Sequence, residues 1–176
     1  MPNFGLTNSV WNNLTGMVST VYHCGAIVNF VKPLKYMREV NVDGTATILK
    51  LCYEAGAKLV HISTLGIFSG SVSGTRLEQA SVPPPRFGGY PQSKWLAEQL
   101  VLSALKTHKF QATIIRLGTI GPDSKTGAAN SNDTFSRLVT GLIDIGVTCS
   151  GNDVDNPLPK SFQLVPVDWT AQAIVR

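Results

Sequence analysis

The chain has 176 residues, of which 43% are hydrophobic, a share high enough for one folded domain and too high for intrinsic disorder. The formal net charge is +4, but the basic residues are scattered and form no stripe of the kind that binds nucleic acid. No apolar stretch approaches the roughly 18 residues that span a bilayer, and the N-terminus lacks a secretory signal. We therefore expect a cytoplasmic protein that binds neither nucleic acid nor a membrane.

Short β-type runs alternate along the chain with longer amphipathic segments. Helices are predicted over residues 9–18, 36–55, 90–106 and 134–145, and from Asp168, as the cap, to Arg176. Strands are predicted over 20–24, 58–63, 111–117 and 161–165, and loops over 69–89 and 118–133. This alternation predicts an α/β fold in which a parallel sheet has helices on both faces.

The ends of the predicted strands indicate where a ligand would bind. In parallel sheets, ligands bind beyond the carboxyl ends of the strands. The loops after Cys24, Ser63 and Leu117 should therefore lie along one edge of the sheet, and we expect the chemistry of the protein there.

Tyr90 and Lys94 give the sharpest local signal, because residues four apart share one face of a helix. A cation close to a phenol lowers its pKa and brings it towards useful acid–base strength. Ser63 and Thr64, at the end of the preceding strand, offer hydroxyls that could hold a carbonyl oxygen against the phenol. The spacing alone is common by chance, and its position after this strand gives it weight.

The set Thr64, Tyr90 and Lys94 resembles the extended short-chain dehydrogenase/reductase superfamily. Further matches follow in the same order along the chain, over residues 21–26, 28–29, 41–45, 116–121, 126–127 and 165–168. Together they resemble the thioester reductase domains that terminate nonribosomal peptide synthetases, carboxylic acid reductases and aminoadipate reductases. The resemblance covers nearly the whole chain.

This resemblance implies a reaction and a role for each site residue. Thr64 would orient the substrate carbonyl, Tyr90 would donate a proton to its oxygen, and Lys94 would tune Tyr90 and bind the nicotinamide ribose. The substrate would be an acyl thioester on the phosphopantetheine arm of a carrier protein, reduced with NADPH to an aldehyde or an alcohol. Cofactor contacts are implied for Gly25, Ala26, Asn41, Tyr90, Lys94, Leu117, Gly118 and Thr119. Without the family, Gly25 is as readily a strand-end turn, and Asn41 a helix-surface amide.

The chain departs from the family at its beginning. The family opens with a strand, a Gly-x-x-Gly-x-x-Gly turn and a helix that binds the pyrophosphate, and this sequence contains no such turn. Strand 20–24 matches a later family strand, so residues 1–176 are predicted to be a single partial Rossmann-like domain whose first βα units are missing. We expect poor NADPH binding, little turnover by the chain alone, and an open sheet edge at strand 20–24 that could pair with another chain.

Two other functions stay open at this point. The chain could belong to another extended dehydrogenase or epimerase that acts on a nucleotide sugar or a sterol. It could also be a non-catalytic remnant of the fold.

The remaining chemically active residues are assigned structural roles. The cysteines Cys24, Cys52 and Cys149 are expected to be free thiols, because their spacing fits neither a metal site nor a disulfide framework. His23 and His61 lie in apolar strands and are expected to be core histidines whose nitrogens are hydrogen-bonded. No metal site is expected, at Asp153 and Asp155 or elsewhere.

Overall fold

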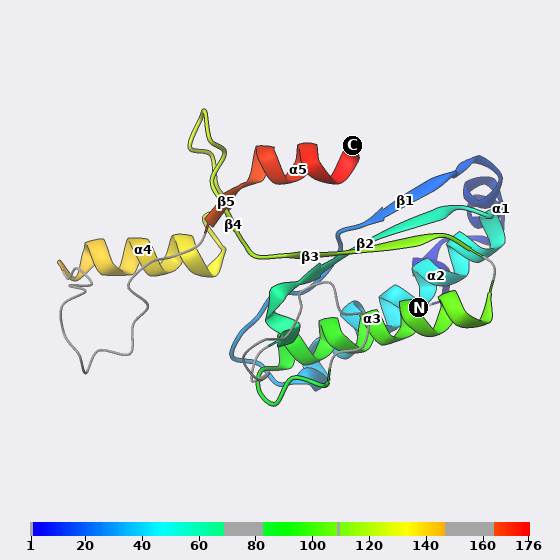
Figure 1. The fold of residues 1–176 in the computed structure, drawn as a ribbon, viewed down its shortest axis with the longest axis horizontal. Helices are drawn as coiled ribbons and strands as arrows, with labels where there is room; N and C mark the ends of the chain where they lie inside the picture. Colours follow the sequence, from blue (N-terminus) through cyan, green and yellow to red (C-terminus); the bar gives the residue numbers. More distant parts are fainter. Residues whose placement is uncertain (1, 69–82, 109, 147–163) are drawn as a thin grey trace. The chain divides into compact units, whose positions relative to one another are not determined.

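A computed structural model of the chain describes residues 2–68, 83–108, 110–146 and 164–176. The chain forms two compact units, Met1–Leu117 and Gly118–Arg176, and each is described by itself (Figure 1). The elements of the first unit are α1 (Asn8–Met17), β1 (Thr20–His23), α2 (Gly44–Ala55), β2 (Lys58–Thr64), α3 (Gly89–Thr107) and β3 (Ala112–Leu117). The prediction placed α1, α3 and all three strands to within one residue at each end.

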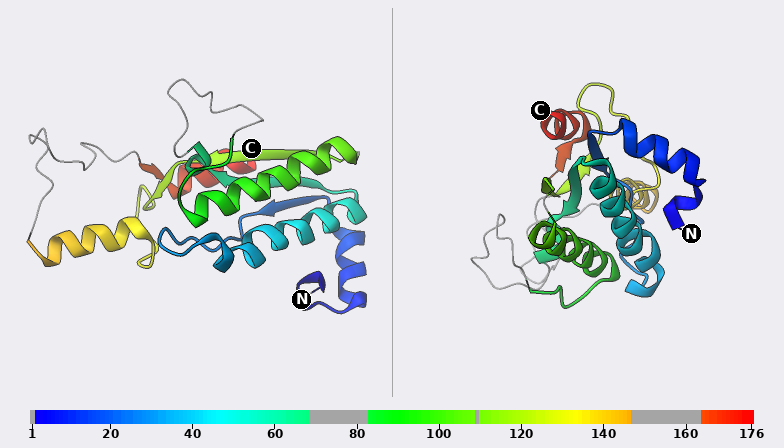
Figure 2. Two further views of the ribbon diagram at one scale, coloured as in Figure 1. Left: turned by 90° about the horizontal axis from the view of Figure 1, so that it is seen from below. Right: turned by 90° about the vertical axis from the view of Figure 1, so that its right-hand side faces the viewer.

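The three strands form a parallel sheet in the order β1-β2-β3, which confirms the α/β class. The register sets His23 opposite His61 and Thr64 opposite Leu117. The strands therefore end at one edge of the sheet, as predicted. Within the described part of this unit, α2 and α3 lie side by side on the same face of the sheet (Figures 1 and 2). Their adjacent placement brings α3 residues to the carboxyl edge.

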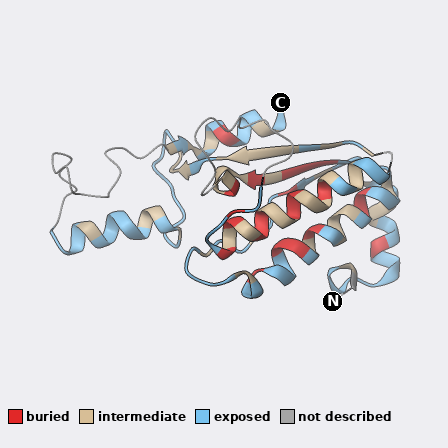
Figure 3. Cartoon of the chain, turned by 60° about the horizontal axis from the view of Figure 1, so that its bottom comes forward, coloured by how far each residue is buried: buried red, intermediate tan, exposed pale blue. Residues whose placement is uncertain are grey.

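The core of the first unit lies between this sheet face and the two helices. Cys52 of α2, Leu59 of β2 and Val101 of α3 are fully buried and contact one another. Half-buried apolar residues, among them Val21 and Ile114, pack against them. Figure 3 shows the buried residues along the inner sides of α2 and α3. Burying one such side chain stabilises the fold by about 1.5–3 kcal/mol, so this face of the sheet is firmly held.

The predicted helix 36–55 has a different beginning in the structure. Residues Arg38–Asp43 form a π-helical turn, and the amide of Gly44 donates to the carbonyl of Glu39, five residues earlier. The α-helix α2 starts only at Gly44 and ends before Gly56, whose φ of 62° is the left-handed conformation that stops helices. Single π turns inside helices are frequent at functional sites.

The second unit contains β4 (Thr119–Gly121), α4 (Thr134–Asp144), β5 (Leu164–Pro166) and α5 (Val167–Val175). β4 pairs in parallel with β5, so the prediction of a continuous loop over 118–133 was wrong at its start. Asp168 is not the cap of α5, because Pro166 holds that position. Its carboxylate instead accepts hydrogen bonds from the amide and hydroxyl of Ser124, which ties α5 to the loop after β4.

Three further predictions concern edges, membranes and metals. Among the described residues β1 pairs with β2 alone, which leaves its other edge open. None of the helices in the described ranges is long and apolar enough to cross a bilayer. The described part of the chain holds no cluster of three potential metal ligands, while Asp153, Asp155 and Cys149 lie outside it.

Candidate active site

Thr64 and Tyr90 meet at the carboxyl edge of the sheet. Thr64 is the last residue of β2, and Tyr90 lies in the first turn of α3. The hydroxyl of Thr64 is hydrogen-bonded to the phenol of Tyr90, and its oxygen accepts a bond of 3.1 Å from the amide of Gly66. The structure thus brings together the two residues that the sequence paired across 25 residues of intervening chain.

Lys94 lies one helical turn beyond Tyr90 and is 3% exposed. Its ammonium donates a hydrogen bond of 2.6 Å to the carbonyl of Ile62, two residues before Thr64. Burial lowers the pKa of Lys94 to about 8, and the charges of Glu98 and Cys24 oppose this effect. Lys94 therefore joins the helix to the strand end that holds Thr64.

The pKa of Tyr90 moves in the direction opposite to the one predicted. Burial raises it, and the hydrogen bond from Thr64 lowers it in part. The predicted lowering assumed that the Lys94 ammonium lies against the phenol, whereas in the structure it is bonded to the backbone of Ile62. The phenol of Tyr90 is consequently protonated at neutral pH and is a proton donor.

Asn41, in the π turn, connects the loop after β1 to α3. Its side-chain oxygen accepts a bond of 2.7 Å from the amide of Ile27, and its side-chain nitrogen donates to the carbonyl of the same residue at 2.9 Å. The nitrogen also donates to the hydroxyl of Ser93 at 2.8 Å, and Ser93 in turn donates to the carbonyl of Tyr90. Asn41 is 1% exposed, so its side chain is buried and links the loop after β1 to α3. It is not the helix-surface amide that the sequence without the family would also allow.

The same loop lies directly on the beginning of α3. A Cβ at Gly89 would stand 2.5 Å from the carbonyl oxygen of Lys32 and 2.5 Å from the amide nitrogen of Leu34. The missing side chain lets the two backbones touch. The ring of Phe30 then meets the ring of Tyr90 edge-on, with centroids 5.5 Å apart. This loop therefore forms one wall of the site.

Six of the eight residues predicted to contact the cofactor lie in the first unit, and Gly25, Ala26 and Leu117 are the three not yet described. Gly25 is exposed, and an added Cβ would meet only the ring of His23, at 3.8 Å. The fold itself does not require a glycine here, which fits the close approach of a ligand to the backbone. Ala26 is half-buried beside it, and Leu117 is half-buried at the end of β3. Gly118 and Thr119 belong to the second unit, and their cofactor role stays a prediction.

The two strand histidines differ from each other. His23 is hydrogen-bonded through Nε2 to the hydroxyl of Thr45 at 3.0 Å, as expected of a core histidine. His61 is fully buried, and neither of its nitrogens has a partner in the described structure, so the expectation of a satisfied side chain was wrong for it. The two rings lie 5.3 Å apart, and the nearby Lys94 and the burial lower the pKa of both.

An ion pair beside the site was not predicted. Arg116 of β3 and Glu98 of α3 form a two-pronged pair with bonds of 2.8–3.3 Å. The sequence did offer a signal, because Glu98 follows Lys94 by four residues and so shares its helix face. Arg116, however, appeared only as part of a motif match.

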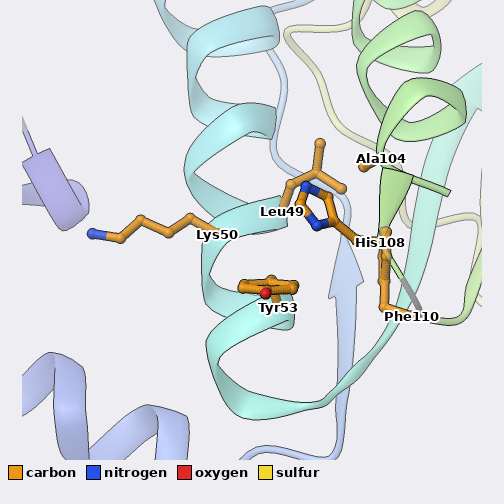
Figure 4. Close-up of a pocket in the computed structure, with 6 residues that line it drawn as sticks. All are labelled: Leu49, Lys50, Tyr53, Ala104, His108 and Phe110. Atoms are coloured by element: carbon orange, nitrogen blue, oxygen red, sulfur yellow. The ribbon is translucent and has the colours of Figure 1, made fainter. Parts of the chain in front are cut away.

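A pocket of about 170 Å³ lies away from these residues (Figure 4). It is lined by Leu49, Lys50, Tyr53, Ala104, His108 and Phe110. His108 and Phe110 come between α3 and β3, so the pocket lies at the amino ends of the strands. The ring of Tyr53 packs on that of His108 at 4.8 Å, and we assign this pocket no part in the chemistry at the carboxyl edge.

Comparison with known proteins extends this description. A model of an NAD-binding family, described as "Male sterility protein", matches residues 1–174. The chain is 34% identical over 177 residues to glycine betaine reductase ATRR of Emericella nidulans, which matches 98% of this chain and 13% of that protein. It is 34% identical over 191 residues to the L-2-aminoadipate reductase large subunit of Penicillium chrysogenum, with 99% and 13% covered.

A solved structure resembles the chain over its whole length. The terminal R domain from the myxalamid PKS-NRPS biosynthetic pathway superposes with a TM-score of 0.87 at 34% identity. The match covers 99% of this chain and 43% of that domain. The chain is therefore similar to a part of a reductase domain and spans about one eighth of the two curated relatives.

Proposed function

The chain belongs to the NAD-binding family described as "Male sterility protein", and we propose that it is the catalytic part of an NADPH-dependent thioester reductase. One observation carries the proposal: the Thr64–Tyr90 hydrogen bond stands at the carboxyl edge of the sheet, with Lys94 buried directly behind it. The relatives named above are reductases, and the similar solved structure is the terminal R domain of a peptide synthetase pathway.

Tyr90, Thr64 and Lys94 would each have a different role in carbonyl reduction. Tyr90 holds the proton that the carbonyl oxygen needs when it becomes an alkoxide, because its raised pKa keeps the phenol protonated. Thr64 presents its hydroxyl beside that phenol and would share the same oxygen. In the structure the ammonium of Lys94 is bonded to the carbonyl of Ile62, and to stabilise the phenolate that remains after the proton has left it would have to turn towards Tyr90.

NADPH would supply the hydride when it is bound. Its adenosine half would approach the backbone at Gly25 and Ala26, where the exposed backbone of Gly25 allows close contact, and its nicotinamide half would lie against Leu117. Asn41 would act by holding the loop that contains these glycine and alanine residues, since its bonds go to Ile27 and Ser93. The sequence offers no glycine-rich turn for the pyrophosphate, so we propose that the chain alone is inactive.

The substrate proposed is an acyl thioester on the phosphopantetheine arm of a carrier domain. Relatives that are peptide synthetases, and the R domain from a peptide synthetase pathway, support this choice. We propose a cytoplasmic location as well, as expected from the sequence. A nucleotide-sugar or sterol dehydrogenase remains the other enzymatic candidate, and the assay below separates the two.

The test uses a chimera in which residues 1–176 replace the matching segment of the terminal R domain from the myxalamid pathway, because the similarity covers 99% of this chain. NADPH oxidation is followed at saturating cofactor with an acyl-phosphopantetheine thioester and, separately, with a nucleotide sugar. Replacing Tyr90 by Phe should reduce thioester turnover by about 10²–10⁴-fold and leave cofactor affinity largely intact, because the proton donor is lost and the ring is kept.

Tyr53→Phe is the matched control, because Tyr53 is 60% exposed on α2 and takes no part in the site. It should keep full activity. Turnover retained by Tyr90→Phe would refute the assigned role of Tyr90, whereas turnover of the nucleotide sugar and not of the thioester would establish the other enzyme class.

A further inference from the structure

The loop over residues 27–36, which follows β1, presents apolar side chains to solvent beside Tyr90. Phe30 is 56% exposed and Val31 is 92% exposed. The ring of Phe30 lies edge-on to that of Tyr90, with centroids 5.5 Å apart, so this surface begins at the candidate active site. Apolar side chains that gather on a surface beside polar neighbours are typical of binding sites.

The backbone of the loop is held in place at three points. The side-chain oxygen of Asn29 accepts hydrogen bonds of 3.0 and 2.7 Å from the amides two and three residues later. Asn41 binds both backbone groups of Ile27, and the backbone at Lys32 lies against Gly89. A fixed backbone thus presents the exposed side chains, which lowers the entropy that is lost when a ligand binds.

Two lysines of the loop lie together without a counter-ion. The ammoniums of Lys32 and Lys35 are 5.7 and 5.1 Å from the centroid of the same ring, that of Tyr36. Both lysines are exposed, and within the described ranges neither forms an ion pair with a carboxylate. Two cations beside one ring repel each other and favour an anion between them, and lysine is a common ligand of phosphate.

The loop and the π turn together are positively charged. Residues 27–41 contain three cations, Lys32, Lys35 and Arg38, and one anion, Glu39. The ring contact with Tyr90 belongs to Phe30, whereas the two lysine ammoniums lie over Tyr36. A ligand that complements this surface therefore has an apolar part next to Tyr90 and an anionic group further along the loop.

We propose that Phe30, Val31, Lys32 and Lys35 bind the phosphopantetheine arm of the acyl substrate. The arm has a phosphate at one end and, leading to the thioester, a chain with an apolar dimethyl group and methylenes. Lys32 and Lys35 bind the phosphate, while Phe30 and Val31 lie along the chain and direct the thioester towards Tyr90. The proposal rests on the proposed function for the identity of the arm.

The test measures affinity in residues 1–176 and needs neither cofactor nor turnover. S-butyryl phosphopantetheine and S-butyryl pantetheine, which lacks the phosphate, are titrated into the ¹⁵N-labelled chain, and the shifts of its NMR signals give the two dissociation constants. The phosphorylated thioester should bind about 3–10-fold more tightly, as expected for two exposed ion pairs. This preference should shrink in about 0.5 M salt, where exposed charges are screened.

Two double variants with the same change of charge locate the phosphate. Lys32→Gln/Lys35→Gln should bind the two thioesters with equal affinity. Lys58→Gln/Lys106→Gln is the matched control, because both lysines are exposed and lie at the opposite edge, where β2 begins and α3 ends. This control should keep the phosphate preference. Phe30→Ala should weaken the binding of both thioesters by the same factor, since the ring contacts the chain and not the phosphate.

A nucleotide sugar also carries phosphate, so UDP-glucose is titrated as a third ligand. Weaker binding of UDP-glucose than of the phosphorylated thioester supports the proposal, and tighter binding that Lys32→Gln/Lys35→Gln abolishes would overturn it. Equal affinity of the wild-type chain for the two thioesters would overturn it as well. So would a phosphate preference that is insensitive to salt or that persists in the Lys32→Gln/Lys35→Gln variant.

The titration and the chimera assay decide different questions. The chimera reports turnover and therefore tests the reductase, whereas the titration reports where the arm binds. A chimera without thioester turnover, together with a phosphate preference that depends on Lys32 and Lys35, would refute the proposed function and leave the binding surface established.

Discussion

At Gly89 the backbone of a neighbouring loop leaves no room for a side chain. A Cβ at this position would overlap the backbone at Lys32, Pro33 and Leu34, with distances of 2.5–2.6 Å. Backbone atoms cannot rotate away as a long side chain can, so the loop after β1 would have to move. That loop positions Phe30 against Tyr90.

Gly89→Ala is therefore expected to destabilise the chain by about 1–3 kcal/mol, the usual cost of overpacking. Urea unfolding followed by circular dichroism measures the change. Gly16→Ala is the control, because Gly16 lies in helix α1 and an added Cβ there meets nothing within 4 Å. That variant should be equally stable or more stable, by up to about 1 kcal/mol, since alanine favours helix. Equal stability of the two variants would show that the loop does not rest on α3.

At the scale of elements, the pattern of apolar residues in the sequence was sufficient to locate the regular helices and strands of the fold. Helix α3 and strand β2 were located to within a residue, because each has a continuous periodic pattern between clear breaks. The π turn before Gly44 was missed, since the sequence pattern does not show that Asn41, within this turn, bonds to Ile27 and Ser93 from elsewhere in the chain. Strand β4 was missed as well, because three residues are too few to show a period.

The residues of the candidate site were likewise predicted only in part. Thr64, Tyr90 and Lys94 were selected as candidates from their places at a strand end and on one helix face, and their catalytic roles stay proposals. The ion pair of Glu98 with Arg116 was not, because it joins a helix to a strand whose pairing only the fold defines. The direction of the Tyr90 pKa was also beyond the sequence, since it depends on burial and on where the Lys94 ammonium binds.

The neighbouring strands β1 and β2 hold two histidines that make the fold sensitive to acid. Burial first, and then Lys94, lower the pKa of His23 from 6.5 to about 4 and that of His61 to about 3. The unfolded chain therefore binds protons that the folded chain does not. The stability that the neutral histidines maintain is complete above pH 6.5 and is lost as the pH falls from 6.5 towards 4, by about 1.4 kcal/mol per pH unit for each histidine.

His61→Leu tests this prediction. It removes one of the two groups and also removes two buried nitrogens that have no hydrogen-bond partner among the described residues. The variant should be more stable than the wild type at pH 5, and its free energy of unfolding should depend on pH about half as steeply between pH 6.5 and 4.5. Urea unfolding at a series of pH values gives both slopes. Identical slopes would contradict the shared role of the two histidines.

On the scale of the whole molecule, the proposed site at the carboxyl edge of the sheet is well formed, whereas the glycine-rich turn that binds a dinucleotide in the resembling family is not found in residues 1–176. The three strands of the first unit end together, and Thr64 and Tyr90, to which we assign proton transfer, are hydrogen-bonded to each other. The sequence has no glycine-rich turn in front of a helix, which is the arrangement that binds a pyrophosphate through backbone amides. We therefore propose that chemistry and cofactor affinity are separated in this chain.

This separation predicts that purified residues 1–176 bind NADPH weakly. The contacts proposed for the adenosine half at Gly25 and for the nicotinamide ribose at Lys94 would not replace the amides that neutralise the diphosphate in the family. A fluorescence titration should show no saturation below about 1 mM, which corresponds to a binding free energy weaker than about −4 kcal/mol. The urea-unfolded chain gives the background signal. Saturable binding in the low micromolar range would show that the first unit holds the diphosphate by residues outside the family pattern, and the proposal that the chain alone is inactive would fall with it.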